Sequence, residues 1–172
     1  MAVLTRASFC ILALMLTAAC RTGQEQWGPF RGQIVDFDTG DPIAGAHVMV
    51  MWLREPPALH LRQTFYDARE TTSGSDGWFE IPSERRWMTA FVTEPAVSVF
   101  VPGYVMEGAA VVTGDGRAYI DPTFIGMRPL TTSAERCRLA PLGPNADADS
   151  HVPRYVAAQN AYKAALRCDQ LE

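Results

Sequence analysis

Between about residue 26 and residue 128, short apolar runs alternate with clusters of glycine, proline and aspartate. The runs are roughly four to eight residues long, which is typical of β-strands and too short for most helices. Gly-Asp-Gly at 114–116 predicts a hairpin, and Ser-Gly-Ser-Asp-Gly at 73–77 predicts a second one. This spacing favours an antiparallel β-sandwich or barrel over alternating βαβ units. The predicted strands cover residues 31–37, 46–53, 78–81, 87–93, 97–101, 109–113, 117–120 and 123–127.

The predicted strand over residues 46–53 is apolar on both of its faces. A strand of this kind is expected to be covered on both sides. The segment 61–72 that follows is polar, and it is expected to connect this strand to the turn at 73–77. The two apolar sets are Val48, Val50 and Trp52 on one face and Met49, Met51 and Leu53 on the other.

A helical pattern appears near the end of the chain, after a loop-like stretch over residues 131–150. Residues 152–166 have the spacing of an amphipathic helix, and Ser150 is placed to cap its first turn. We expect this helix to pack on the sheet, with the face that carries Met49 and Met51 as one candidate surface. Its expected buried side consists of Val152, Tyr155, Val156, Gln159, Tyr162 and Leu166.

The N-terminus carries the features of an export signal. Arg6 precedes an apolar run that ends in Leu-Thr-Ala-Ala-Cys at 16–20. The run is shorter than the roughly 20 residues of a spanning helix, so we expect it to be a cleaved signal. The small residues before Cys20 resemble the lipobox of bacterial lipoproteins, although Thr17 stands where that motif usually has leucine. This resemblance implies cleavage between Ala19 and Cys20 and acylation of Cys20, with palmitate among the expected groups.

Two further points concern this N-terminal segment. Arg21, rather than aspartate, follows the cysteine. By resemblance to enterobacterial sorting rules, this implies lipid attachment to the outer membrane, facing the periplasm. The alternative is ordinary signal cleavage near Ala18, which would leave Cys20 as a free thiol.

Removal of residues 1–19 would leave 153 residues, enough for one domain with a core of its own. Arg6 is the one charged residue in the removed segment, so the remaining chain has 14 basic and 19 acidic residues and a net charge of −5. No basic stripe is present that could neutralise phosphates, which argues against nucleic acid as a partner.

The cysteines predict one disulfide. Of the four cysteines, Cys10 leaves with the signal and Cys20 is the predicted lipid site, so Cys137 and Cys168 remain. In an oxidising compartment, this pair is expected to form a disulfide bond.

Four motifs occur in order along residues 31–104, and together they resemble the carboxypeptidase regulatory-like domain. The resemblance implies a mainly β fold, namely a seven-stranded Greek-key sandwich like that of transthyretin, to which this chain adds a C-terminal α-helix. The resemblance does not imply catalysis. The motifs are Gly-Gln-Ile-Val-Asp at 32–36, Thr-Gly-Asp-Pro-Ile-Ala-Gly-Ala-His-Val at 39–48, Thr-Thr followed by Asp-Gly and an aromatic residue at 71–79, and Pro-Gly-Tyr at 102–104.

These observations divide the chain into four parts. They are a signal peptide over 1–19, a lipid anchor and tether over 20–27, a β-sandwich over 28–130, and a loop with a C-terminal helix over 131–172, tied by the disulfide.

The sequence contains no recognisable catalytic or metal-binding pattern, so it predicts neither a cofactor nor a metal site. His47, His60 and His151 do not have zinc-ligand spacing. The hydroxyisourate hydrolases of the transthyretin-like fold end in Tyr-Arg-Gly-Ser, which this chain lacks. Three aspartates near residue 40, Asp36, Asp38 and Asp41, are interpreted as turn residues, with a calcium loop as the alternative.

Trp78 is the candidate contact residue. If Phe79 and Ile81 point into the core, Trp78 points outward beside Glu80, where it is either an exposed platform or covered by a loop. The leading hypothesis is therefore a non-enzymatic envelope lipoprotein, attached to the membrane through its lipid, whose periplasmic sandwich contacts another envelope protein. The alternative is a carbohydrate-binding module for peptidoglycan or another polysaccharide, with Trp78 as the stacking residue. An enzyme ranks third.

Overall fold

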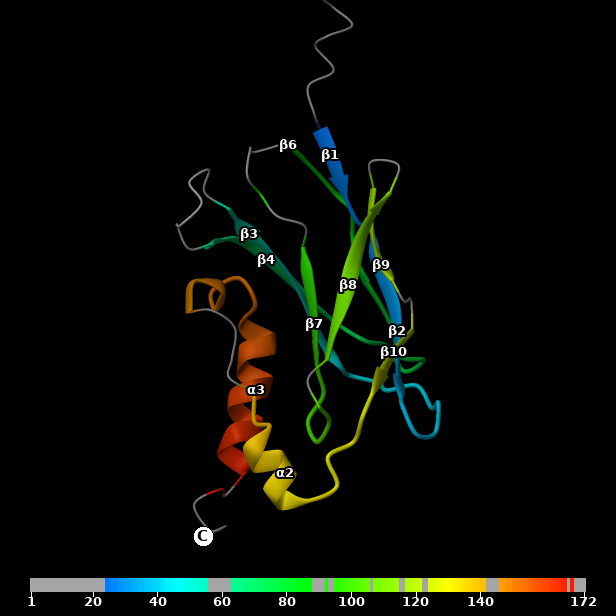
Figure 1. The fold of residues 1–172 in the computed structure, drawn as a ribbon, viewed down its shortest axis with the longest axis vertical. Helices are drawn as coiled ribbons and strands as arrows, with labels where there is room; N and C mark the ends of the chain where they lie inside the picture. Colours follow the sequence, from blue (N-terminus) through cyan, green and yellow to red (C-terminus); the bar gives the residue numbers. More distant parts are fainter. Residues whose placement is uncertain are drawn as a thin grey trace, which may run out of the picture.

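The structure, a computed structural model, describes residues 24–55, 63–87, 92, 95–105, 107–114, 117–121, 124–141, 146–166 and 168. The predicted signal peptide, Cys20 and His60 lie outside the described residues. Within them the chain is mainly β, with helices at one side and one end of the strands (Figure 1). Ten strands are described, three more than the resemblance implies.

Seven of the strands form one sheet and three form a second sheet. In the larger sheet, neighbours are antiparallel except for β1 and β9, which are parallel. In the smaller sheet, β2 is antiparallel to β5 and parallel to β10. The larger sheet has the order β4 (Thr64–Thr72), β3 (His47–Arg54), β7 (Ala96–Phe100), β8 (Glu107–Gly114), β9 (Arg117–Asp121), β1 (Gln24–Trp27) and β6 (Glu84–Trp87). The smaller sheet has the order β10 (Phe124–Met127), β2 (Phe30–Asp36) and β5 (Trp78–Ile81).

The main core lies between the two sheets, which gives the fold its sandwich-like form. Trp52 of β3 is buried in this core, with its ring centroid 6.0 Å from that of Trp27 and 5.9 Å from that of Phe30. Large rings of this kind supply much of the apolar area that a small domain buries. The other core members are Ile34, Ala46, Val48, Val50, Phe79, Ile81, Val97, Val99, Val101, Ile125 and Met127.

The two predicted hairpins have different outcomes. Strands β8 and β9 pair antiparallel from Gly114 and Arg117 outward, which confirms the first, although the turn residues 115 and 116 are not described. The prediction for residues 73–77 was wrong, because this turn carries the chain from β4 in the larger sheet to β5 in the smaller one. Gly77 has φ +76°, and a Cβ there would lie 2.5 Å from the carbonyl oxygen of Ile34. Only glycine fits this close approach between the turn and β2.

Several predicted boundaries also differ from the structure. The polar segment 61–72, which was expected to be a connection, contains β4, and this strand pairs with β3 along its length. The strand expected over 87–93 lies mostly outside the described residues: Trp87 is the last residue of β6, and Val92 forms an isolated bridge with Arg54. The last four residues of the predicted anchor and tether over 20–27 form β1 inside the larger sheet, and residues 20–23 lie outside the described residues.

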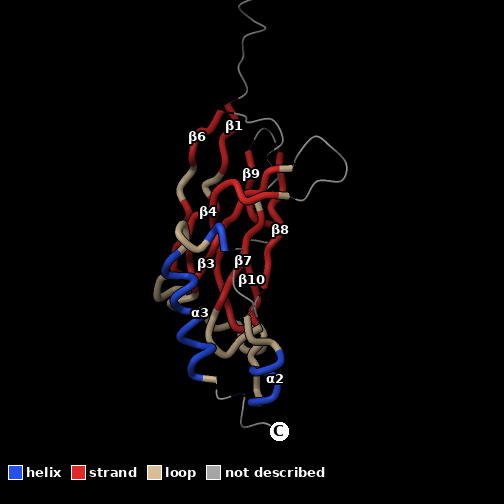
Figure 2. The backbone as a smooth tube through the Cα atoms, turned by 90° about the vertical axis from the view of Figure 1, so that its left-hand side faces the viewer, coloured by secondary structure: helices blue, strands red, loops and turns tan. Residues whose placement is uncertain are grey.

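Helix α3 (Pro153–Ala165) packs on the outer face of the larger sheet, as Figure 2 shows from the side. Tyr155 is fully buried there, its ring 6.2 Å from that of Phe100 and its hydroxyl 2.9 Å from that of Ser98. The helix covers Met49 and packs against Met51, which confirms the predicted surface. The predicted buried side is confirmed too, since Val152, Tyr155 and Gln159 are buried and Val156, Tyr162 and Leu166 are partly buried.

The first turn of α3 is capped by a distant strand residue. The prediction that Ser150 caps the helix was wrong, because the N-cap is Val152 and makes no side-chain cap. Instead, the carboxylate of Glu70 on β4 accepts hydrogen bonds from the backbone amides of Arg154 and Tyr155, at 3.1 and 2.7 Å. The Arg154 guanidinium adds a third bond at 3.0 Å. An anion at the N-terminus of a helix also interacts favourably with the helix dipole.

Glu70→Gln is expected to reduce the free energy of unfolding by roughly 1–2 kcal/mol at pH 7. Burial acts to raise the pKa of Glu70, but the hydrogen bonds from Tyr155 and Arg154 outweigh it and hold the pKa below its ordinary value of 4.5. Because the folded pKa is lowered, the stabilisation is present above that value and is lost as the pH falls through the folded pKa. Urea unfolding at neutral and acidic pH measures it. If the difference in the free energy of unfolding between the native protein and Glu70→Gln does not change with pH, this account is contradicted. Glu80→Gln is the control, because it makes the same substitution at an exposed position.

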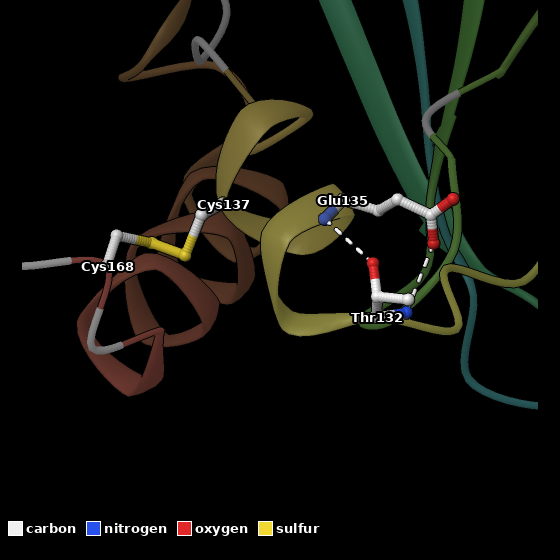
Figure 3. The surroundings of a disulfide bond; sticks show 4 residues. All are labelled: Thr132, Glu135, Cys137 and Cys168. Atoms are coloured by element: carbon white, nitrogen blue, oxygen red, sulfur yellow. Dashed lines mark hydrogen bonds between the residues drawn. A yellow bond between two sulfur atoms is a disulfide. The ribbon is translucent and has the colours of Figure 1, made fainter. Parts of the chain in front are cut away.

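The segment predicted as a loop over 131–150 contains helix α2 (Ser133–Arg138) and the short helix η1 (Ala146–Ala148). Thr132 caps α2 in a capping box: its hydroxyl accepts from the Glu135 amide, and the Glu135 carboxylate accepts from the Thr132 amide, both at 3.1 Å (Figure 3). The pattern Thr-x-x-Glu is the sequence signature of this box, so the sequence did contain the signal for α2.

The predicted disulfide is present. Cys137 on α2 is bonded to Cys168, which lies just beyond the end of α3 (Figure 3). The bond therefore ties the two helices together at the end of the molecule opposite the start of β1 (Figure 1).

Candidate functional site

The outer face of the three-stranded sheet is the candidate site. Its central strand, β2, points Phe30 and Ile34 into the core and Arg31 and Gln33 outward. The register places Gln33 between two aromatic residues, Phe124 of β10 on one side and Trp78 of β5 on the other. Because residues in register share a face, these three side chains form one row across the outside of the sheet.

Three exposed aromatic residues, Phe37, Trp78 and Phe124, form what we call the aromatic surface. Their exposed fractions are 71%, 40% and 58%. The rings of Trp78 and Phe124 are tilted toward each other over the row, with centroids 6.2 Å apart and an interplanar angle of 60°. Phe37 follows β2 and lies over β10, since a Cβ on Gly126 would be 3.0 Å from its Cδ2 atom. Exposed aromatic residues gathered on one face mark an interaction site more often than isolated ones do.

Polar groups on the same face hold the aromatic surface in place. The Gln33 side-chain amide donates to the carbonyl oxygen of Asp76 at 2.9 Å. The Asp76 carboxylate accepts from the backbone amide of Trp78 at 3.1 Å. Two residues along β2 and β5 from the Gln33–Trp78 pair, Arg31 Nε lies 2.9 Å from Glu80 Oε2. The turn before β5 is therefore bonded to β2, which fixes the start of the strand that carries Trp78.

The turn after β2 is organised by Asp36. One oxygen of its carboxylate accepts from the amides of Asp38 and Thr39, and the other accepts from the Tyr104 hydroxyl at 2.9 Å. The bond from Tyr104, followed by those from the turn, holds the pKa of Asp36 below its ordinary value. Asp36 thus acts as a turn residue. Among the residues that the structure describes, no three histidine, cysteine, aspartate or glutamate side chains are grouped as metal ligands.

The two described histidines lie elsewhere, near helix α3. His47 is half-buried on β3 beside Phe100, and burial lowers its pKa while the charge of Glu70 acts in the opposite direction. His151 Nδ1 lies 3.0 Å from Asp67 on β4. Both residues therefore belong to the contact between the helix and the larger sheet, not to the aromatic surface.

The sequence identified one of the three members of the aromatic surface. Trp78 does point outward while Phe79 and Ile81 are buried. Phe124 was not identified because its place beside Gln33 depends on a parallel pairing with a strand 91 residues away. Phe37 carried a weak signal, since a phenylalanine directly before an aspartate-rich turn is poorly placed to enter a core.

Comparisons of the chain with models of known protein families, with curated proteins and with solved structures give no match. In the described part of the chain, no helix is long and apolar enough to cross a membrane.

Proposed function

We propose that this protein is a non-enzymatic lipoprotein of the cell envelope, anchored in the outer membrane through Cys20 and facing the periplasm. Its β-sandwich acts as an interaction module, and the aromatic surface contacts an envelope protein. The observation that carries this proposal is the aromatic surface itself: three exposed rings on one face of a sheet whose other face is packed in the core. Exposed tryptophan and phenylalanine are costly to leave in water, and they are common anchors of protein contacts.

We also propose that the sandwich is a carboxypeptidase regulatory-like domain of the Greek-key, transthyretin-like type. The support comes from two of the motifs. Asp36 ends the Gly-x-Ile-x-Asp motif and Tyr104 ends the Pro-Gly-Tyr motif, and their side chains are joined by a hydrogen bond of 2.9 Å. A bond between motif residues 68 positions apart gives both of them a structural role in one fold.

The position of β1 supports a module held close to its anchor. Strand β1 begins at Gln24, four residues after Cys20. Four extended residues span at most about 14 Å. An acylated Cys20 would therefore hold the sandwich within this distance of the bilayer. Figure 1 shows the start of β1 at the end of the molecule opposite α2.

Site-specific photo-cross-linking in cells tests the protein contact. A photoreactive amino acid in place of Phe124 is expected to give a discrete protein adduct, because its ring is exposed beside Trp78. Trp78→Ala should abolish that adduct by removing the neighbouring ring. The matched control is the same substitution at Asn160, which is exposed on α3. Adducts that are absent at position 124, or equal at 124 and 160, would contradict the proposal.

Carbohydrate binding is the alternative function. The observation that favours it is the Trp78 ring on the same face as the Gln33 amide and the Arg31–Glu80 pair, since sugars stack on rings and bond to planar polar groups. Co-sedimentation with peptidoglycan tests it, and retention that is unchanged in Trp78→Ala would remove this alternative.

A further inference from the structure

Carboxylates surround the aromatic surface. Phe37 and Trp78 each have an acidic residue within two positions on both sides. β2, β5 and the turns beside them carry four exposed carboxylates, with one exposed guanidinium group on β2 and one directly after β10, an excess of two negative charges. The carboxylates are Asp38, Asp41, Asp76 and Glu80, and the guanidinium groups are those of Arg31 and Arg128. Asp36 is not counted, because its carboxylate accepts hydrogen bonds from Tyr104 and from the turn amides.

We propose that the aromatic surface binds a positively charged protein segment in which arginine or lysine side chains stand beside apolar ones. This inference rests on the proposed interaction function and names the chemistry of the partner. A cation over an exposed indole gains a cation–π interaction, and its apolar neighbours can cover the rings of Phe37 and Phe124. The surrounding carboxylates attract such a segment at longer range and select against acidic ones.

The surface already holds one guanidinium group of the chain itself. Arg31 lies 2.9 Å from Glu80, and the two side chains remain 60% and 47% exposed. Glu80 stands two residues after Trp78 on the same face of β5, so this pair shows that a carboxylate of the surface can bind a guanidinium group. Asp38 and Asp41 are exposed on the neighbouring turn and provide further acceptors.

The same charges disfavour the other occupants of this face. Anionic lipid headgroups and acidic polysaccharides are repelled by the negative excess, so the surface is poorly suited to lie on a bilayer. A neutral saccharide could stack on Trp78 and donate hydrogen bonds from its hydroxyls to the carboxylates, but it carries no charge for them to attract at longer range. A basic protein segment is the occupant that uses both the rings and the charges.

Binding of two synthetic peptides to the full-length protein in detergent micelles tests this inference. The peptides have equal length and alternate leucine with arginine in one and with glutamate in the other. We expect the arginine peptide to bind, with an affinity that falls as salt is added, and the glutamate peptide not to bind. Asp38→Lys/Asp41→Lys is expected to weaken binding by about tenfold or more, and Trp78→Ala should weaken it comparably.

The matched control is Glu55→Lys/Asp149→Lys, which makes the same change in net charge at exposed positions on other elements and should leave binding unchanged. Equal binding of both peptides, or no effect of the Asp38→Lys/Asp41→Lys change, would overturn the inference. Binding of chitohexaose or of anionic phospholipid vesicles in place of the arginine peptide would overturn it too. If the position-124 adduct forms in cells and the arginine peptide does not bind, the proposed function stands and this inference fails. If the adduct is also absent, both fail.

Discussion

Tyr155→Ala is expected to reduce the free energy of unfolding by about 4 kcal/mol, the largest effect of any single substitution considered. The side chain is 1% exposed and lies under α3 against Phe100. Its removal would leave a cavity between the helix and the larger sheet, and it would also leave Ser98 without the hydroxyl that now lies 2.9 Å from it. Urea unfolding followed by tryptophan fluorescence measures the loss.

Tyr155→Phe is the matched control for that experiment. It keeps the ring and removes the hydroxyl, so it should cost about 1 kcal/mol. If the alanine variant costs no more than the phenylalanine variant, the packing of α3 described above is wrong, because the ring would then contribute nothing to stability.

Removal of the disulfide has the second largest expected effect. Cys137→Ser/Cys168→Ser should lower the free energy of unfolding by roughly 3 kcal/mol, because the bond closes a segment with a sequence separation of 31 residues and restricts the unfolded chain. The same bond joins α2 to the end of α3, so the last turn of α3 should fray in the variant. Hydrogen exchange of amides 162–166 would detect this fraying.

Reduction of the native protein provides an internal control for the disulfide prediction. Dithiothreitol should bring the native protein to the stability of the double variant and should leave the variant unchanged. A variant whose stability equals that of the oxidised native protein would contradict the prediction.

Local pattern in the sequence was sufficient for the elements that bury an alternating or helical set of apolar side chains. Strands β2, β3, β5 and β7 have this property, and so does α3, whose buried side was predicted correctly. The pairing of Cys137 with Cys168 followed from there being two cysteines left for an oxidising compartment.

The two strands that were missed, β4 and β1, are stabilised by groups distant in the sequence, whereas the missed helix α2 has a local signal in its capping box. Strand β4 is polar because it lies at the edge of the sheet and uses Glu70 to cap α3, a role that no local pattern reveals. Strand β1 is four residues long and depends on pairing with β6 and β9. The aromatic surface combines residues from three separate segments, so it could be recognised only after the register of β10 and β5 against β2 was known.

In the proposed function, the lipid anchor and the aromatic surface act together. An acylated Cys20 would determine where the sandwich is held, and the aromatic surface would determine what it contacts there. The carboxylates beside the rings would then restrict the partner to positively charged segments.

The most direct test of this account is the incorporation of labelled palmitate into the protein in its native cell envelope. We predict that the native protein takes up the label and fractionates with the outer membrane, and that Cys20→Ser loses the label while Cys10→Ser keeps it. Labelling that persists in Cys20→Ser, or a native protein that takes up no label, would contradict the account.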